Sequence, residues 1–437
     1  MKSIFRVSLL RRFFTSVREE GAGTAMRKAR IYLGMRLRGI TPSILGGTKT
    51  GDVRADHTYM AGMWQTLAQR DAFHIETPPA YLSKRRKIAL IGDLNLPQCR
   101  KYRVEQLAEF WEAQGVSVEY AHYQDVPRCT AILQSATHLM EYRLQTSAVT
   151  AMYRYEARRL RLPVLYDLDD PLFSVSAYET YRNMQAVEPE LKEHFVSEAP
   201  KYLEMMNGAD IITVSTPGLA KHARLLSPRQ VHVRRNFADR ATLALGAAVK
   251  STVKAQDGNF RVCFASGSRG HEADFALISD QLVKFLASDD SHRLMILGHF
   301  DKKHLPATLQ DRVETYRFST YDKYLGVLAR ANVALMPLTD DVFNHCKSAV
   351  RVIDASSVGV PSLVGPIGDM DNVVDHGRTG LIVQDSHEWG GALAALAADK
   401  AATAAMGEAA RWDVETRWSG QPSSRIIDPE ILEWIKD

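Results

Sequence analysis

The sequence predicts an α/β protein with two consecutive doubly wound, Rossmann-like domains that face a cleft. Three observations predict it. The 437 residues are too many for one ordinary domain. From Lys87 onward, short continuous apolar runs alternate with longer amphipathic stretches, which is typical of parallel strands covered by helices on both faces. This alternation pauses once, between 238 and 259, and then begins again.

The apolar runs give the expected strands. In the first half these are 88–91, 116–120, 131–133, 163–168, 210–214 and 231–233. In the second half they are 261–265, 294–297, 313–318, 333–336, 361–364 and 381–383. We therefore expect a basic N-terminal extension (1–84), a first domain (85–237), a linker (238–259), a second domain (260–418) and a tail or helix (419–437) that could cross back to the first domain.

Composition describes a soluble globular chain. Hydrophobic residues make up 45% and charged residues 24%, and 55 basic against 51 acidic residues give a net charge of +4. This near balance argues against a nucleic-acid partner. The four cysteines are scattered without zinc-ligand spacing, which predicts free thiols in a reducing compartment. No apolar run approaches the ~18 residues that a membrane span needs. The expected location is the cytoplasm.

The charge is uneven, because ten of the first forty residues are Lys or Arg and only Glu19 and Glu20 oppose them. Bulky apolar and cationic residues alternate over 4–14, which would allow peripheral contact with an anionic membrane. A leader or a helix packed on the body of the protein fits the same residues, and the sequence leaves both interpretations open.

The segment 344–361 predicts a ligand site in the second half. A polar loop leads into an expected helix over 347–358, which Gly359 and Pro361 end before the next strand. Its N-terminus would suit a diphosphate, and Lys347 and Ser348 add a cation and a hydroxyl there. Lys347, Arg351 and Asp354 would share one helix face, with Asp354 roughly 10 Å along the axis, placed for sugar hydroxyls. The alternative is a solvated face with an Arg351–Asp354 ion pair.

A second loop, within 264–275, has the pattern of a phosphate-binding turn, because a strand runs into a Gly/Ser turn and then a helix. The alternative for its histidine is a helix cap. The candidate binding residues of this loop are Gly267, Ser268, Arg269 and His271.

Two clusters stand out in the first half. Arg100 to Arg103 open a helix after the first strand, and Arg103 is the residue expected to reach the cleft, although such a cluster can also face water. The strand 163–168 ends in an acidic string that would repel itself unless cations or hydrogen bonds compensate. Asp169 and Asp170 are its candidate functional residues.

These motifs resemble the GT-B fold glycosyltransferases, most closely family four, the large retaining group one. Asp354, five residues before Gly359-Val360-Pro361, falls on the glutamate that binds ribose in that family. The glutamate that contacts the transferred sugar falls on Cys346, which departs from the pattern. The resemblance covers about 85–418, is strongest beyond Arg261, and extends to the loops 365–372 and 376–381. The 346–348 and 266–275 segments are similar to a bacterial surface-polysaccharide subgroup.

The resemblance implies transfer of a sugar from a UDP-, GDP- or dTDP-sugar to a glycan, lipid-linked or protein acceptor, with retention and without an essential cofactor or metal. Arg269, Lys347 and Arg351 would stabilise the leaving diphosphate, and Asp169 or Asp170 would act at the acceptor hydroxyl or the anomeric carbon. Cys346 keeps open an alternative, a catalytically silent nucleotide-sugar-binding or partner subunit. A sugar-nucleotide epimerase of the same architecture fits the pattern before Pro361 less well.

Overall fold

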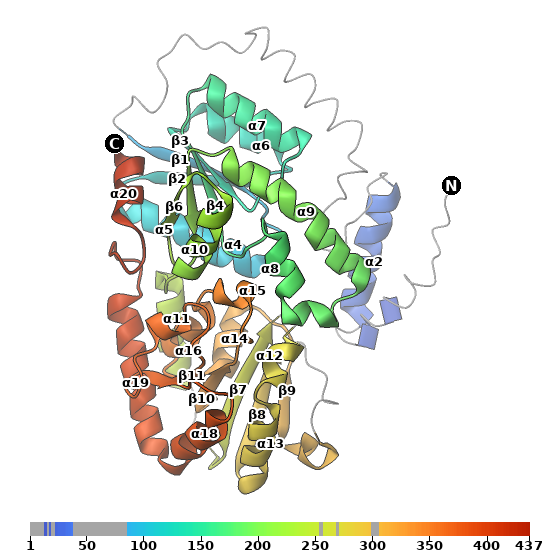
Figure 1. Ribbon diagram of the computed structural model, residues 1–437, viewed down its shortest axis with the longest axis vertical. Coiled ribbons are helices and arrows are strands. Elements are labelled where there is room, and N and C mark those ends of the chain that lie inside the picture. Colours follow the sequence, from blue (N-terminus) through green and yellow to red (C-terminus); the bar gives the residue numbers. More distant parts are fainter. Residues whose placement is uncertain are drawn as a thin grey trace. The chain divides into compact units, whose positions relative to one another are not determined.

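The computed structural model describes residues 13–14, 17–18, 22–37, 85–252, 257–267, 271–298 and 306–437. The expected binding residues Ser268 and Arg269, and most of the basic segment 4–14, lie outside the described residues. The chain divides into two compact units. The smaller comprises 1–76 and 147–159 and includes helices α2 (Ala22–Leu37) and α7 (Ala148–Arg159). The larger, 77–146 and 160–437, contains both sheets (Figure 1).

The first sheet has the order β2-β1-β3-β4-β5-β6, and every neighbouring pair is parallel. Its strands are β1 (Lys87–Gly92), β2 (Ser117–His122), β3 (His138–Tyr142), β4 (Val164–Leu168), β5 (Ile211–Val214) and β6 (Gln230–Val233). The helices of this half in the larger unit are α4 (Pro97–Arg100), η3 (Lys101–Glu105), α5 (Gln106–Ala113), α6 (Val126–Gln134), α8 (Val175–Thr180), η4 (Arg182–Ala186), α9 (Pro189–Asn207) and α10 (Pro217–Leu226).

The second sheet is also parallel throughout, in the order β12-β11-β10-β7-β8-β9. Its strands are β7 (Phe260–Gly267), β8 (His292–Gly298), β9 (Val313–Tyr316), β10 (Val333–Met336), β11 (Ser362–Val364) and β12 (Gly380–Ile382). The helices of this half are α11 (Arg240–Thr252), α12 (Glu272–Ala276), α13 (Ser279–Ser288), η6 (Ala307–Arg312), α14 (Tyr321–Leu328), α15 (Val342–His345), α16 (Val350–Ser357), α17 (Met370–Val373), α18 (Glu388–Ala398), α19 (Lys400–Arg417) and α20 (Pro429–Lys436).

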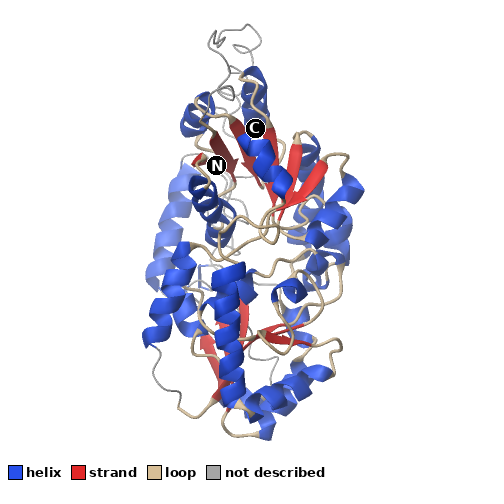
Figure 2. Ribbon diagram, turned by 90° about the vertical axis from the view of Figure 1, so that its left-hand side faces the viewer, coloured by secondary structure: helices blue, strands red, loops and turns tan. Residues whose placement is uncertain are grey.

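Helices flank the strands of both sheets, as Figure 2 shows. The central strands β3, β4, β5, β10 and β11 are buried at every residue, which is the burial expected of parallel strands covered on both faces. The predicted fold class, two doubly wound Rossmann-like domains, is therefore confirmed. No helix in the described part of the chain is long and apolar enough to cross a membrane.

Two predicted elements were wrong in position. The expected strand 131–133 lies inside α6, and the true third strand is β3, which was not predicted because His138 and Glu141 interrupt its apolar run. Both polar side chains are nevertheless buried. The helix expected over 347–358 begins only at Val350. The expected linker contains a regular helix, α11.

The C-terminal segment returns to the first sheet. The Asp428 backbone N–H donates to the Val233 carbonyl at 2.9 Å, and the Val233 N–H donates to Asp428 Oδ2 at 2.7 Å. Farther along α20, the Trp434 ring lies 5.1 Å from the His138 ring. The C-terminal segment thus packs against strands β6 and β3 of the first sheet.

Candidate functional site

The strand order of the second sheet gives it a switch point beside β7. From β7 the chain proceeds through β8 to β9 on one side, and then through β10 to β12 on the other. Adjacent loops separate at such a point and leave room for a ligand beyond the carboxyl ends of the strands. His271 follows β7 here, and the segment 337–349 between β10 and α16, which includes α15, contains Lys347 and Ser348.

His271 immediately precedes α12 in the loop after β7. Its Nδ1 lies 3.2 Å from Oδ2 of Asp274, and the imidazole is mostly buried. Burial, followed by the charges of Arg351 and Lys347, lowers the pKa of His271 and outweighs the opposing effect of Asp274. A neutral imidazole near pH 7 follows, held in place by a buried carboxylate.

Lys347 lies in the loop between α15 and α16. Its Nζ is 3.5 Å from Oδ1 of Asp170 in the first half, 4.8 Å from the Phe343 ring centroid and 5.9 Å from that of Tyr181. Burial alone would lower the pKa of Lys347, but the charge of Asp170, together with smaller contributions from Tyr181 and Asp274, outweighs burial and the pKa rises. Lys347 is therefore a fixed cation, and its side chain keeps 23% of its surface exposed.

The backbone at Lys347 is held by the loop after β11. Its carbonyl accepts a hydrogen bond of 2.9 Å from the Asp369 N–H, next to Gly368. Gly368 has φ +81°, and a Cβ there would lie 2.9 Å from the Lys347 carbonyl oxygen, so this position requires glycine. Part of the 365–372 loop thus supports the Lys347 loop directly.

Ser348 and Arg351 already have protein partners. The Ser348 hydroxyl accepts a 3.1 Å hydrogen bond from Asn236 Nδ2, which comes from the end of the first half. Arg351 Nη1 donates to the Ala265 carbonyl at 2.8 Å, near the end of β7. We expected Lys347, Arg351 and Asp354 to share one helix face. This is wrong, because α16 begins at Val350 and Lys347 precedes the helix.

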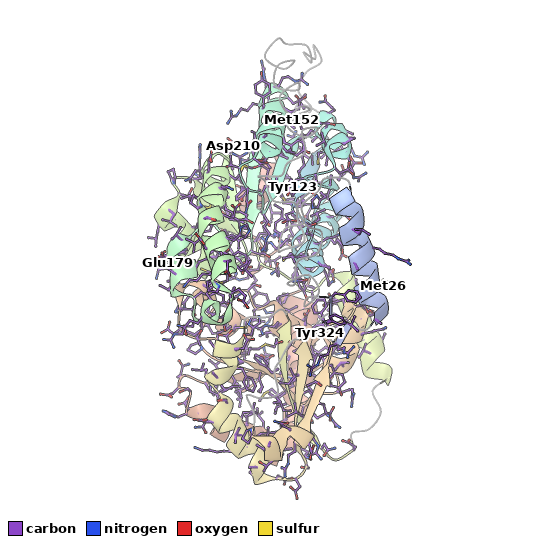
Figure 3. The ribbon with its side chains drawn as sticks, turned by 90° about the vertical axis from the view of Figure 1, so that its right-hand side faces the viewer. Met26, Tyr123, Met152, Glu179, Asp210 and Tyr324 are labelled. Carbon is purple, nitrogen blue, oxygen red and sulfur yellow. The ribbon has the colours of Figure 1, made fainter. Side chains whose placement is uncertain are left out.

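Asp354 is nearly inaccessible, with 2% of its surface exposed. Its Oδ2 accepts a 2.8 Å hydrogen bond from the Tyr102 hydroxyl of the first half, and its Oδ1 accepts one of 2.7 Å from Tyr321. Tyr324, labelled in Figure 3, lies on α14 one turn beyond Tyr321. Burial raises the pKa of Asp354 to about 6, although both tyrosine hydrogen bonds act to lower it. Two tyrosines therefore donate hydrogen bonds to the carboxylate that is expected to bind ribose.

Asp169 and Asp170 follow β4, and both carboxylates lie close to Arg143. Asp169 accepts a 3.2 Å hydrogen bond from Tyr142, and Arg143 Nη1 lies 3.5 Å from Asp169 and 3.9 Å from Asp170. Burial, followed by the charge of Asp170, raises the pKa of Asp169. Arg143 has φ +53°, a left-handed conformation rare for arginine. The structure thus supplies the compensating cations, Arg143 and Lys347, that the acidic string requires.

The expectation that Arg103 reaches the cleft is wrong, because its side chain is fully buried. Its guanidinium forms a bidentate pair with Asp167 and donates from Nη1 to the Arg234 carbonyl at 2.8 Å and to Asn236 Oδ1 at 3.1 Å. These partners leave no surface of Arg103 for a substrate. The side chain stabilises the first half.

Gly218 sets a close backbone contact between the two halves. A Cβ there would lie 2.1 Å from the His345 carbonyl oxygen, while Thr216 Oγ1 donates to the Cys346 carbonyl at 3.0 Å. Gly218→Ala is expected to lower the free energy of unfolding by about 2 kcal/mol, because the backbone segments must separate. Urea denaturation measures this change.

Gly326→Ala is the matched control, because the structure leaves open space around a Cβ at that helix position. Equal stability of the Gly218 and Gly326 variants would contradict the close contact.

Sequence reasoning missed three residues that the structure brings to these groups. Tyr102 lay within the 100–103 cluster, but charge drew attention to its neighbours. Arg143 follows β3, the strand that was not predicted. Asn183 reaches Asp274 at 2.9 Å from η4, and no sequence pattern marks it.

One group in the described part of the chain brings three potential metal ligands together. Side-chain atoms of His232, Asp428 and Glu430 lie within 4.8 Å of one another where β6 meets α20. Asp428 Oδ2 already accepts the Val233 N–H, and Glu430 is exposed. This group is separate from the loops at the switch point.

The two parallel six-stranded sheets with their helices define a GT-B fold, and solved structures share it. Sucrose-phosphate synthase from Thermosynechococcus elongatus has a TM-score of 0.52 and 17% identity, covering 77% of this chain and 95% of that one. HepE from Anabaena, in complex with UDP and glucose, has a TM-score of 0.53 and 14% identity, covering 81% and 100%. A glycosyltransferase from Rickettsia africae has a TM-score of 0.53 and 10% identity, covering 81% of this chain and 98% of that one.

Within this fold, residues 260–399 match the family model described as glycosyl transferases group 1. The matched range includes every predicted second-half site residue, from Gly267 to Asp354. No curated protein matches the chain. The family match and the shared fold agree with the resemblance found in the sequence.

Proposed function

We propose that the chain is a glycosyltransferase that moves a sugar from a nucleoside diphosphate sugar to a glycan, lipid-linked or protein acceptor, with retention. One observation carries the proposal. Lys347, a fixed cation beside the switch point of the family-matched sheet, lies 3.5 Å from Asp170 at the carboxyl end of β4 in the other sheet. A cation for the leaving diphosphate therefore lies next to carboxylates that can act on the sugar or the acceptor.

The chemistry follows from these charges. Cleavage of a glycosyl–phosphate bond leaves negative charge on the diphosphate, which Lys347, Arg351 and the N-terminus of α16 would stabilise electrostatically. Asp169 or Asp170 would stabilise positive charge at the anomeric carbon or orient the acceptor hydroxyl. The Lys347–Asp170 ion pair fixes the positions of both groups. A bound diphosphate would replace Asp170 as the partner of the Lys347 ammonium.

Asp354 would bind the ribose in this proposal. A carboxylate offers about four acceptor positions, so the two tyrosine hydrogen bonds leave capacity for ribose hydroxyls. Its low exposure requires that Tyr102 move aside when the ribose enters. HepE was solved with UDP and glucose, which makes UDP-glucose the first donor to test.

Lys347→Ala is expected to weaken binding of UDP, GDP or dTDP sugars about 30-fold, or about 2 kcal/mol, because a charge-assisted phosphate contact is lost. Calorimetric titration of the full chain measures it. Lys221→Ala, an exposed lysine on α10, serves as the matched control and should bind as the wild type does. Unchanged nucleotide affinity in the Lys347 variant would remove this loop from the donor site.

The second candidate is a silent nucleotide-sugar-binding subunit, favoured by one observation. Cys346 replaces the family glutamate and is 1% exposed, so its side chain cannot contact a sugar. Labelled nucleotide sugars separate the two functions, because an active transferase slowly hydrolyses its donor even without acceptor. Tight binding without any turnover, with several donors and with lipid extracts, would establish the silent subunit.

A further inference from the structure

The carboxylate of Asp274 lies at the centre of a buried polar cluster and makes five hydrogen bonds with four residues. Its Oδ1 accepts from the Thr339 N–H at 2.9 Å, from the Thr339 hydroxyl at 3.2 Å and from Asn344 Nδ2 at 3.0 Å. Its Oδ2 accepts from Asn183 Nδ2 at 2.9 Å and lies 3.2 Å from His271 Nδ1. Asp274 itself is 1% exposed. So many donors around one carboxylate hold it in its ionised form.

The ionised carboxylate decides the tautomer of His271. Burial would raise the pKa of Asp274, but hydrogen bonds from His271 and from the Thr339 N–H outweigh burial and lower it. A carboxylate that only accepts requires that His271 Nδ1 be the donor. The second nitrogen, Nε2, makes no hydrogen bond with any residue that the structure describes. It is the nitrogen available to a ligand.

The charges around His271 are Asp274 and Glu272 on α12, Lys347 in the loop before α16, and Arg351 on α16. Two of them are cations in the loop and helix that we propose for the diphosphate. They disfavour a third positive charge while the site is empty. A diphosphate would neutralise them and reverse that effect.

We propose that His271 binds the diphosphate of the donor as an imidazolium, with Asp274 as its counter-ion, so that donor binding takes up one proton from solvent at Nε2. This inference rests on the proposed function. A neutral Nε2 has only a lone pair and cannot donate to a phosphate oxygen, whereas the protonated nitrogen can. The proton is supplied by buffer and forms an N–H bond at Nε2, and no other covalent bond changes.

Asn183 acts as a positioning residue for this pair. Its Oδ1 accepts the N–H groups of Ala273 and Asp274 at 3.0 and 3.4 Å, which caps α12 from the first half of the chain. Beside it, the Tyr181 ring stacks on Phe343 with centroids 4.3 Å apart. Asn183 Nδ2 and His271 Nδ1 both contact Oδ2 of Asp274. Removing the Asn183 amide therefore leaves more negative charge on Asp274 to stabilise the imidazolium.

The direction of the pH dependence follows. In the free protein the pKa of His271 lies below its ordinary value of 6.5, and bound diphosphate raises it. Affinity is therefore highest below the pKa of the free protein, falls as pH rises from that value to the pKa of the complex, and is constant above it. Below the pKa of the free protein, His271 is already protonated and binding takes up no further proton.

Calorimetric titration of the full chain with UDP-glucose, GDP-mannose and dTDP-glucose in turn tests the inference, because their diphosphates do not titrate near neutral pH. Two buffers of unlike ionisation enthalpy are used between about pH 5.5 and about pH 8. Between the two pKa values of His271, the wild type should take up close to one proton more than His271→Gln, and its affinity should fall relative to that variant by up to about 10-fold per pH unit. Any pH dependence that both proteins share belongs to other groups of the site, such as Asp354, whose pKa is about 6.

Asn183→Ala should keep the proton uptake but shift its midpoint to higher pH, whereas a merely structural role would weaken binding equally at every pH. Gln185→Ala, exposed on the same η4 helix, is the matched control. If Asn183→Ala does not fold, the comparison of proton uptake between the wild type and His271→Gln decides the inference. Equal proton uptake by the wild type and His271→Gln overturns the inference and leaves the proposed function intact. Failure to bind any of the three donors defeats the proposed function, and the inference with it.

Discussion

Asp167→Ala is expected to lower the free energy of unfolding by about 4 kcal/mol, because it leaves two buried guanidiniums without a counter-ion. Asp167 Oδ2 lies 3.0 Å from Arg103 Nε and 3.3 Å from Arg234 Nη2, and all three side chains are at most 2% exposed. Burial, followed by the charge of Arg103, lowers the pKa of Arg234 to about 9, which still leaves it charged at neutral pH. Urea denaturation followed by circular dichroism measures the loss.

Asp311→Ala, an exposed aspartate in η6, is the matched control and should change stability by less than about 0.5 kcal/mol. A comparably small loss in the Asp167 variant would mean that water or other groups solvate the two arginines. Because the cluster lies in the first half, nucleotide affinity of the folded Asp167 variant should stay close to that of the wild type.

The second large effect is a pH-dependent penalty at Asp354. Its pKa is raised from 3.8 to about 6 in the folded protein, so folding favours the protonated acid. The stability that this group contributes is full below about pH 4 and is lost as pH rises through about 6. The shift corresponds to about 3 kcal/mol. Urea denaturation at pH values on both sides of this range measures it.

Asp354→Asn isolates this effect, because the amide keeps the shape, accepts from one tyrosine and donates to the other. The stability difference between variant and wild type should change by about 3 kcal/mol between about pH 4 and about pH 7.5, in favour of asparagine at the higher pH. A difference that stays constant with pH would mean that Asp354 titrates normally. Other titrating groups cancel in the comparison.

The architecture could be predicted because parallel strands buried on both faces leave a direct record in the chain. Runs such as Ile88–Ile91 and Val333–Met336 have apolar side chains on both faces, and the structure places strands there. Strand β3 could not be found in this way. Its His138 and Glu141 are buried polar groups that interrupt the apolar run, and His138 packs against Trp434 from the far end of the chain.

The sequence predicts the residues of the candidate site by type, but it does not predict their partners. Arg103 and Lys347 are both cations near expected strand ends, yet one is enclosed by Asp167 and Asn236 and the other lies against Asp170. Local sequence carries no sign of this difference. It depends on which carboxylate the folded chain brings within reach.

By itself, then, the sequence determined the fold class and the second-half loops of the site, because strand rhythm and Gly/Ser turns are local properties that a chain displays residue by residue. Only the tertiary structure decided which charges are paired. Tyr102 with Asp354, Asn183 with Asp274 and Asp170 with Lys347 each join residues at least 91 positions apart. The energy of a charge depends on its burial and on its nearest opposite charge, and both are fixed only when the two sheets and their loops have packed.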